Sequence, residues 1–165
     1  MKILFAASEA VPFAASGGLA DVVGSLPKAI KSKRHDCRVV MPLYKSVAPE
    51  FRDKMVFVTN ITVDVSWRKQ YCGIFMAIQD GITYYFIDNE YYFYGPKPYE
   101  DGIWDLEKFA YFSKAALSIL PLIDFQPDVI HCHDWQTGLV PVYLKTDFCR
   151  GDFFSEMNDL VDVFL

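Results

Sequence analysis

The 165-residue chain lacks the features that mark membrane and exported proteins. No apolar run approaches the roughly 20 residues that a membrane-spanning helix needs. The first residues open directly into a strand-like pattern, without the basic segment, apolar core and small-residue cleavage site of a signal peptide. We therefore expect a cytoplasmic protein with no membrane partner.

Positive charge is scarce as well. The 16 Lys and Arg residues are outnumbered by 21 Asp and Glu residues, which gives a net charge of −5. Nucleic-acid binding depends on clustered cations that displace counterions. The one basic cluster, residues 31–34, lies at the end of a predicted helix, where it complements the helix dipole. We expect no nucleic-acid partner.

The four cysteines show no C-x-x-C spacing. Three of them, Cys37, Cys72 and Cys132, lie in apolar, strand-like segments. Free cysteine is among the most often buried residue types. We therefore predict free thiols, and we expect all four, Cys149 included, to react with a thiol reagent only after denaturation.

Apolar residues are plentiful, because 52% of the chain is hydrophobic and 16% is aromatic. A chain of this length buries about two-thirds of its unfolded surface. We predict a single domain over residues 1–165 that folds alone. The pattern assigns no element to the tail at 146–165.

Most of the apolar pattern alternates between strand and helix. The predicted strands of a parallel sheet are 2–7, 37–43 and 129–132, and the predicted helices are 18–31, 105–120 and 138–145. The first three elements form a β-α-β unit with a right-handed crossover. Asp105 is the predicted N-cap of its helix.

An antiparallel segment interrupts this alternation. Residues 55–67 alternate in hydrophobicity as in a hairpin or meander, and predicted strands at 71–78 and 82–87 flank an Asp80-Gly81 turn. Residues 90–104 are rich in Tyr, Gly and Pro and are typical of a long loop. The sequence therefore predicts an α/β fold with a Rossmann-like, doubly wound, mostly parallel sheet and an antiparallel hairpin excursion.

Ser16, Gly17 and Gly18, the glycine turn, lie between the first predicted strand and helix. Glycines there let the backbone approach an anion, and the first helical turn offers free N–H groups and the positive end of the dipole. The residues alone also fit a tight turn without a ligand. Asp21 is likewise either a site carboxylate or one that stabilises the helix dipole.

The segment His-Cys-His-Asp at 131–134 follows the last predicted strand. Ligands of open parallel sheets bind beyond the carboxyl ends of strands, so we expect this segment and the glycine turn to face one cleft. Alternation sends His131 and His133 to the face opposite Cys132, which argues against a metal site. Asp134 fits either a cleft carboxylate or the N-cap of the following helix.

Four separated segments resemble the bacterial glycogen synthases and plant starch synthases in that family's order and approximate spacing. They are residues 1–22, 39–44, 86–93 and 127–141. The resemblance implies the N-terminal, acceptor-side half of a two-domain GT-B glycosyltransferase. Such an enzyme transfers glucose from ADP-glucose to the non-reducing end of an α-1,4-glucan such as glycogen or a maltooligosaccharide, with retention and without a cofactor or metal.

The resemblance also implies roles for individual residues. Two carboxylates would line the cleft beside the reacting sugar, the glycine turn would bind the donor, and four further residues would contact the acceptor. The catalytic pair is Asp21 and Asp134, the donor residues are Ser16, Gly17 and Gly18, and the acceptor residues are Asn89, Tyr99, His133 and Gln136.

Three departures separate the chain from the family pattern. Ala15 stands where the family commonly has a phosphate-facing lysine, and the family's donor-contacting histidine is not reached before Leu165. The C-terminal nucleotide-binding domain is absent from these residues, so we expect no transfer by this chain alone. Two other hypotheses stay open: a stand-alone glucan-binding or regulatory module without catalysis, and a structural fragment with no ligand.

Overall fold

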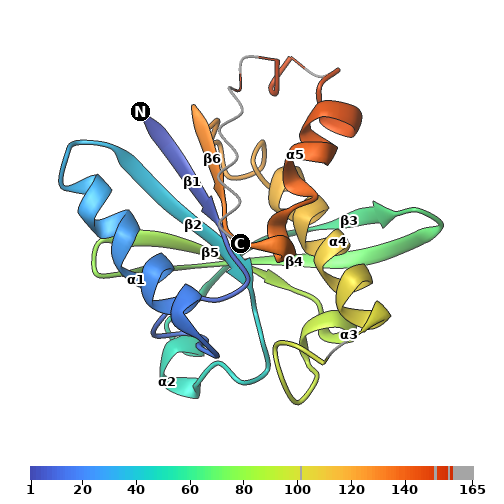
Figure 1. Ribbon diagram of the computed structural model, residues 1–165, viewed down its shortest axis with the longest axis horizontal. Helices are drawn as coiled ribbons and strands as arrows, with labels where there is room; N and C mark the ends of the chain where they lie inside the picture. The colour runs from blue at the N-terminus through green and yellow to red at the C-terminus, as the bar shows by residue number, and fades with distance from the viewer. Residues whose placement is uncertain (101, 151, 156, 158–165) are drawn as a thin grey trace.

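A computed structural model describes residues 1–100, 102–150, 152–155 and 157 (Figure 1). The end of the chain at 161–165, where the family pattern is interrupted, lies outside them. The described strands form one six-stranded sheet in the order β3-β4-β5-β2-β1-β6. They are β1 Lys2–Ala6, β2 Asp36–Pro42, β3 Val56–Val65, β4 Arg68–Gln79, β5 Ile82–Asp88 and β6 Val129–Cys132.

The helices of the described residues are short apart from two. They are α1 Gly18–Lys31, α2 Pro49–Arg52, α3 Glu90–Phe93, α4 Ile103–Ser118 and α5 Val140–Tyr143, with a 3-10 turn at Trp135–Thr137 and a π-helical turn at Leu144–Phe148. None of them is long and apolar enough to cross a membrane. The predicted helix at 138–145 is divided into α5, which has Pro141 near its start, and the π-helical turn that follows it.

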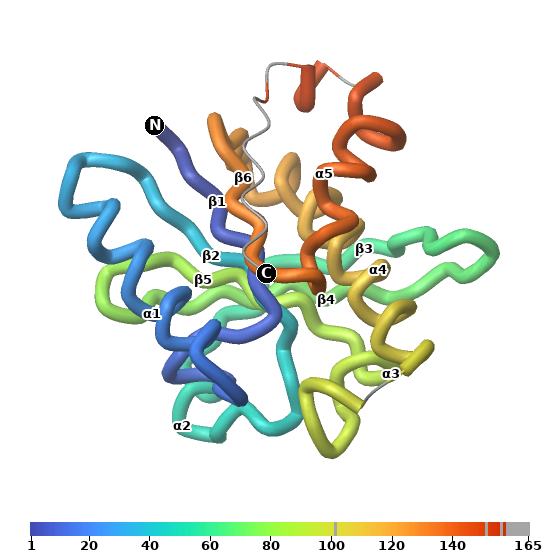
Figure 2. Tube along the Cα trace, in the orientation of Figure 1, coloured from blue at the N-terminus to red at the C-terminus, as the bar shows by residue number. Residues whose placement is uncertain are grey.

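Four neighbouring strands, β5, β2, β1 and β6, run parallel. Strand β4 pairs antiparallel with β5, and β3 pairs antiparallel with β4. The connection through α1 leads from β1 to β2, whereas α4 precedes β6 on the other side of β1. Right-handed crossovers in opposite directions place helices on opposite faces. Figures 1 and 2 show α1 on one side of β1, β2 and β6, and α4 and α5 on the other. The predicted doubly wound, mostly parallel sheet is confirmed.

Strand β1, between β2 and β6, is buried on both faces. Phe5 and Ala6 have no exposed surface, as a parallel strand covered by helices on both sides requires. After β1, the ring of Phe13 packs edge-on against Tyr84 and Phe86 of β5, with centroid distances of 4.9 Å each. This packing anchors the loop that leads to the glycine turn.

A glycine brings α1 close to the same loop. A Cβ at Gly24 would lie 2.2 Å from Cγ2 of Val11 and 3.1 Å from the Val11 carbonyl oxygen, so a larger residue would push the two apart. The Val11 N–H also donates to the Ala20 carbonyl at 3.1 Å. Loop and helix pack as one unit, which sets the position of the glycine turn.

The sequence predicts one long loop at 90–104, and this prediction is wrong. Its first residues form α3, because the Asn89 side chain caps them by accepting a hydrogen bond from the Tyr92 N–H at 3.0 Å. Its last residues belong to α4, which begins at Ile103. The prediction missed both because Tyr, Gly and Pro dominate the composition of the segment.

Asp105 does not cap α4 in the predicted way. Gly102 is the N-cap, and Asp105 is the third residue of the helix. The Asp105 carboxylate turns back to the preceding loop, where it accepts a hydrogen bond from the Glu100 N–H at 2.9 Å. The capping prediction is wrong in position, although the carboxylate does bind backbone N–H near the helix start.

One cysteine departs from the prediction. Cys37, Cys72 and Cys132 are free and buried in strands, and burial raises the pKa of Cys72 and of Cys132 to about 12. Cys149 is exposed, because it follows the π-helical turn at the surface. The prediction that all four thiols are buried is wrong.

Candidate functional site

The carboxyl ends of β1 and β6 form the point at which the winding of the sheet reverses. The two strands pair in parallel with Ala6 opposite Cys132, and the His133 N–H donates to the Ala6 carbonyl at 3.0 Å. Ligands of doubly wound sheets bind at such a point. The loops after β1 and β6 therefore meet at one edge, which we call the switch-point edge.

The glycine turn opens α1 at this edge. Gly17 is the N-cap, its backbone is extended, and no side chain caps the helix. A Cβ at Gly17 or Gly18 would meet no atom within 4 Å. Neither packing nor backbone strain requires glycine here, so the space before the first helical turn is open. Asp21 is exposed in that first turn, where the helix dipole favours its charge.

Glu9 fixes the glycine turn, and the sequence reasoning missed it. The residue is only 2% exposed, and its carboxylate accepts hydrogen bonds from both the backbone N–H and the hydroxyl of Ser16, each at 2.7 Å. Charge-assisted bonds of this kind are stronger than neutral ones. The available signal was a carboxylate placed just after a fully apolar strand at the switch point.

Tyr99 reaches the same edge from the loop before α4. Its hydroxyl and that of Ser8 form a hydrogen bond of 2.7 Å. The pKa of Tyr99 is raised to about 12, chiefly by burial, and the negative charges of Glu9 and Asp134 act in the same direction. The structure thus gathers three segments that lie far apart in the sequence.

Tyr44, two residues after the end of β2, is a second residue that the sequence reasoning missed. It is 2% exposed, and within the described residues its hydroxyl has no hydrogen-bond partner. Burial, followed by the neighbouring Tyr99, Glu9 and Asp105, raises its pKa. The Tyr44 ring packs edge-on against that of Phe93, with the ring centres 5.8 Å apart.

Asp134 has a strained backbone at the switch-point edge. Its φ of 63° and ψ of 179° lie in a region that favours glycine, at a cost of about 1–3 kcal/mol. The carboxylate accepts a hydrogen bond from the Trp135 N–H at 2.6 Å and caps the following 3-10 turn. Strain of this kind clusters at functional sites.

His133 and Gln136 are buried beside Asp134, with exposed fractions of 2% and 5%. Burial, and secondarily His131, lowers the pKa of His133 to about 4, so its ring is neutral at pH 7. The His131 and His133 rings stack at 4.2 Å, on one face as alternation predicts. Among the described residues, no group of three or more His, Cys, Asp or Glu could hold a metal ion.

Asn89 lies apart from the other predicted site residues. It follows β5, and its amide donates to the Tyr71 carbonyl at 2.7 Å and to Oε1 of Gln70 at 3.3 Å. With its cap on α3, these bonds tie β4, β5 and α3 together. Asn89 lines a separate hollow of about 420 Å³ beside Asp88 and Tyr91.

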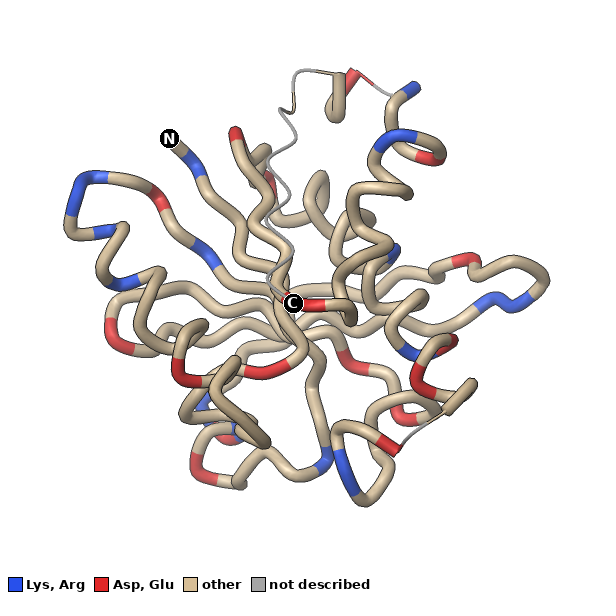
Figure 3. The backbone as a smooth tube through the Cα atoms, in the orientation of Figure 1, with Lys and Arg blue, Asp and Glu red and all other residues tan. Residues whose placement is uncertain are grey.

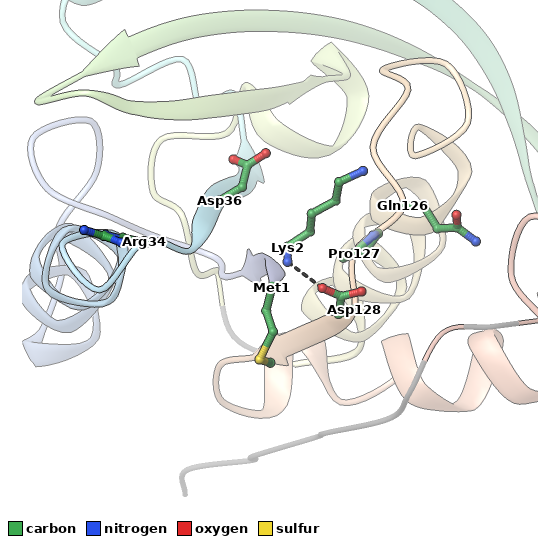
Figure 4. A pocket seen from close by; sticks show the side chains of 7 residues that line it. All are labelled: Met1, Lys2, Arg34, Asp36, Gln126, Pro127 and Asp128. Atoms are coloured by element: carbon green, nitrogen blue, oxygen red, sulfur yellow. Dashed lines mark hydrogen bonds between the residues drawn. The ribbon is translucent and has the colours of Figure 1, made fainter.

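The opposite, amino edge of the sheet carries another hollow, of about 380 Å³ (Figure 4). The residues that line it are Met1, Lys2, Arg34, Asp36, Gln126, Pro127 and Asp128. The charged ones are exposed, and the Asp128 carboxylate accepts a hydrogen bond from the Lys2 N–H at 2.7 Å. Figure 3 shows Lys and Arg gathered near the C-terminal end of α1 on this side. No predicted site residue lines this hollow.

The comparisons with known proteins give a consistent result. A family model described as starch synthase catalytic domain matches residues 2–161. The chain is similar to glycogen synthase of Lachnospira eligens, with 53% identity over 98% of the chain and 34% of the relative. It is similar to glycogen synthase of Geobacillus stearothermophilus, with 51% identity over 99% of the chain and 33% of the relative.

A solved structure matches as well. It is the catalytic domain of starch synthase IV from Arabidopsis thaliana bound to ADP and acarbose, with a TM-score of 0.86 and 27% identity over 98% of this chain and 33% of that one. The chain thus spans about a third of the length of the proteins it matches.

Proposed function

Because the chain belongs to the starch synthase catalytic domain family, we propose that it forms the N-terminal, acceptor-side domain of a glycogen or starch synthase that uses ADP-glucose. The observation that carries the proposal is the switch-point edge, where the glycine turn, Tyr99 and Asp134 come together. The domain would extend over residues 1–165. The enzyme's second domain, which holds the nucleotide, would lie in the part that the relatives have beyond this third.

On the donor side, the glycine turn would receive the diphosphate of ADP-glucose. The first-turn amides of α1 and the positive end of its dipole favour an anion, and the open space before Gly17 and Gly18 admits one. Glu9 would hold Ser16 so that the turn keeps this shape. The starch synthase IV structure contains both ADP and acarbose, which is consistent with a donor site and an acceptor site in one family member.

On the acceptor side, the glucan would lie along Tyr99, His133 and Gln136. Nε2 of the neutral His133 ring and the side-chain oxygen Oε1 of Gln136 are polar atoms without hydrogen-bond partners among the described residues, which suits recognition of sugar hydroxyls. Trp135, 44% exposed, offers a ring face beside them. Asn89 would contribute at a more distant position, because its amide already serves the fold.

The two carboxylates would act near the reacting sugar. Positive charge develops on that sugar as the diphosphate departs, and fixed negative groups stabilise it. The Asp134 carboxylate is held by its bond to the Trp135 N–H, whereas Asp21 is exposed on the surface of α1. Stabilising the departing diphosphate would require cations from the second domain, since position 15 is Ala15.

Isothermal titration with maltoheptaose tests the proposal in the 165-residue chain. We expect heat from binding, none with the β-linked cellohexaose, and at least tenfold weaker binding for Tyr99→Ala. The control is Trp67→Ala, at the hairpin tip, where the side chain is 84% exposed. We also expect no transfer of labelled glucose from ADP-glucose by the chain alone. Silence with maltoheptaose, or labelled product above the no-protein background, would contradict the proposal.

A further inference from the structure

A buried ion pair lies on α4 beneath the loop that carries Tyr99. Lys108 is 1% exposed and Asp105 is 4% exposed, and Nζ of Lys108 lies 2.7 Å from Oδ1 of Asp105. Such residues are almost never fully buried unless paired. A buried pair is also weak evidence for stability, because apolar residues of similar volume often stabilise a protein as well or better. The contacts of the pair indicate a different role.

Each ion holds one of the two residues next to Tyr99. Nζ of Lys108 donates to the Pro98 carbonyl at 2.8 Å, and Oδ2 of Asp105 accepts a hydrogen bond from the Glu100 N–H at 2.9 Å. The two peptide groups therefore cannot rotate without breaking a charge-assisted bond. We call this arrangement of Asp105 and Lys108 the clamp.

The Tyr99 side chain extends from the clamp to the switch-point edge. Its ring lies 5.8 Å from that of Phe109, and the Lys108 ammonium lies 5.4 Å from the centre of the same Phe109 ring. The Tyr99 hydroxyl then meets Ser8 at 2.7 Å. Phe109 therefore sets the direction of the ring, while the clamp fixes its backbone.

We propose that the Asp105–Lys108 clamp is a positioning device for Tyr99 in glucan binding. Neither ion touches the glucan, and both act by fixing the backbone from which the Tyr99 ring projects. This inference rests on the proposed function, in which Tyr99 contacts the acceptor. It adds that α4, and not the loop itself, determines where Tyr99 stands.

The test replaces both ions at once, since removing one would leave the other buried and unpaired. Asp105→Leu with Lys108→Met keeps the volume and releases the backbone, and Asp105→Val with Lys108→Leu is the second variant if the first does not fold. The control is Lys114→Met with Asp147→Leu, which removes a more exposed ion pair that also involves α4. Hydrogen exchange at the Glu100 amide and maltoheptaose affinity are measured in all of them.

We expect the Glu100 amide to exchange at least tenfold faster in the clamp variant, and maltoheptaose to bind about tenfold more weakly, with both unchanged in the control. Adding the clamp substitutions to Tyr99→Ala should cost no further affinity, because the clamp acts through Tyr99. Unchanged exchange, or an equal loss of affinity in the Tyr99→Ala background, overturns the inference. A wild-type chain that binds no maltoheptaose overturns the proposed function instead, and the exchange result still decides whether the clamp holds the loop.

Discussion

The two edges of the sheet use charge in opposite ways. At the carboxyl edge, Glu9, Asp105 and Lys108 are buried and each is bonded to backbone or to a counterion. At the amino edge, Lys2 and Asp128 are exposed, and charges of both signs line an open hollow. Burying a charge is expensive unless it is fully bonded. The difference therefore shows where the fold has spent free energy on fixing positions, and that edge is the one with the candidate site.

The strongest way to break this contrast is to unpair one buried ion. Lys108→Met leaves the Asp105 carboxylate buried without its counterion, which typically costs about 3–5 kcal/mol. Urea unfolding should show a loss of that size. Lys114→Met, in a pair with side-chain exposures of 21% and 39%, should cost about 1 kcal/mol or less. Equal losses in the two variants would contradict the contrast between buried and exposed charge.

The pH dependence of stability sharpens the contrast at His133. Its folded pKa of about 4 lies below the unfolded value near 6.5, so the unfolded state binds the proton first as the pH falls. The stabilising contribution is present above pH 6.5 and is lost between pH 6.5 and 4, by about 3 kcal/mol. Unfolding free energies at several pH values should show this fall, and His133→Gln should flatten it. An unchanged slope in the variant would mean that His133 takes up its proton without hindrance in the folded state.

The glycine turn offers a test in which binding changes and folding does not. A Cβ at Gly18 meets nothing, so Gly18→Val should leave the unfolding free energy within about 1 kcal/mol while it blocks the approach of a diphosphate. In a protein that carries the rest of the synthase, ADP affinity should fall about tenfold. Ala15→Lys should raise it about fivefold to a hundredfold, as a charge-assisted bond of roughly 1–3 kcal/mol implies. Titration with ADP measures both, and no change in either would remove the donor role from the turn.

The smallest effect belongs to the amino edge. Asp128→Asn keeps an oxygen that can accept the hydrogen bond from the Lys2 N–H and removes one exposed charge. We expect a change in unfolding free energy below about 0.5 kcal/mol and no change in maltoheptaose binding. A large loss in either measurement would show that the amino edge also depends on fixed charge.

The strands and their order along the chain were predictable because the apolar pattern is strong and local. The turn at Asp80-Gly81 and the parallel strand around Val39 follow from residues close in sequence. The rule for doubly wound sheets predicts that the glycine turn and His133 lie at one edge of the sheet. The boundaries of α4 were not predictable in this way, because Gly102 carries the N-cap position while Asp105 carries the capping chemistry.

The connections within the site were not predictable, because they join distant segments. Ser8 and Tyr99 are 91 residues apart, and no local pattern indicates that one hydroxyl will meet the other. The only sequence signal for a role of Glu9 was its position just after a strand, and nothing in the local sequence distinguished Lys108 from other polar residues of its helix. Asn89, which the family resemblance groups with the acceptor residues, lies apart because its side chain is needed where β4, β5 and α3 meet.

The pairing of β1 has a consequence for how the chain folds. On one side β1 pairs with β2, with Lys2 opposite Asp36. On the other side it pairs with β6, whose residues lie 126 positions further along the chain than their partners in β1. Pairing over such a separation is slow, because a long loop must close first. During synthesis, one edge of the apolar strand β1 therefore stays unpaired until β6 has been made, and an unpaired strand edge is a template for aggregation. The switch-point edge is completed only when β6 pairs with β1.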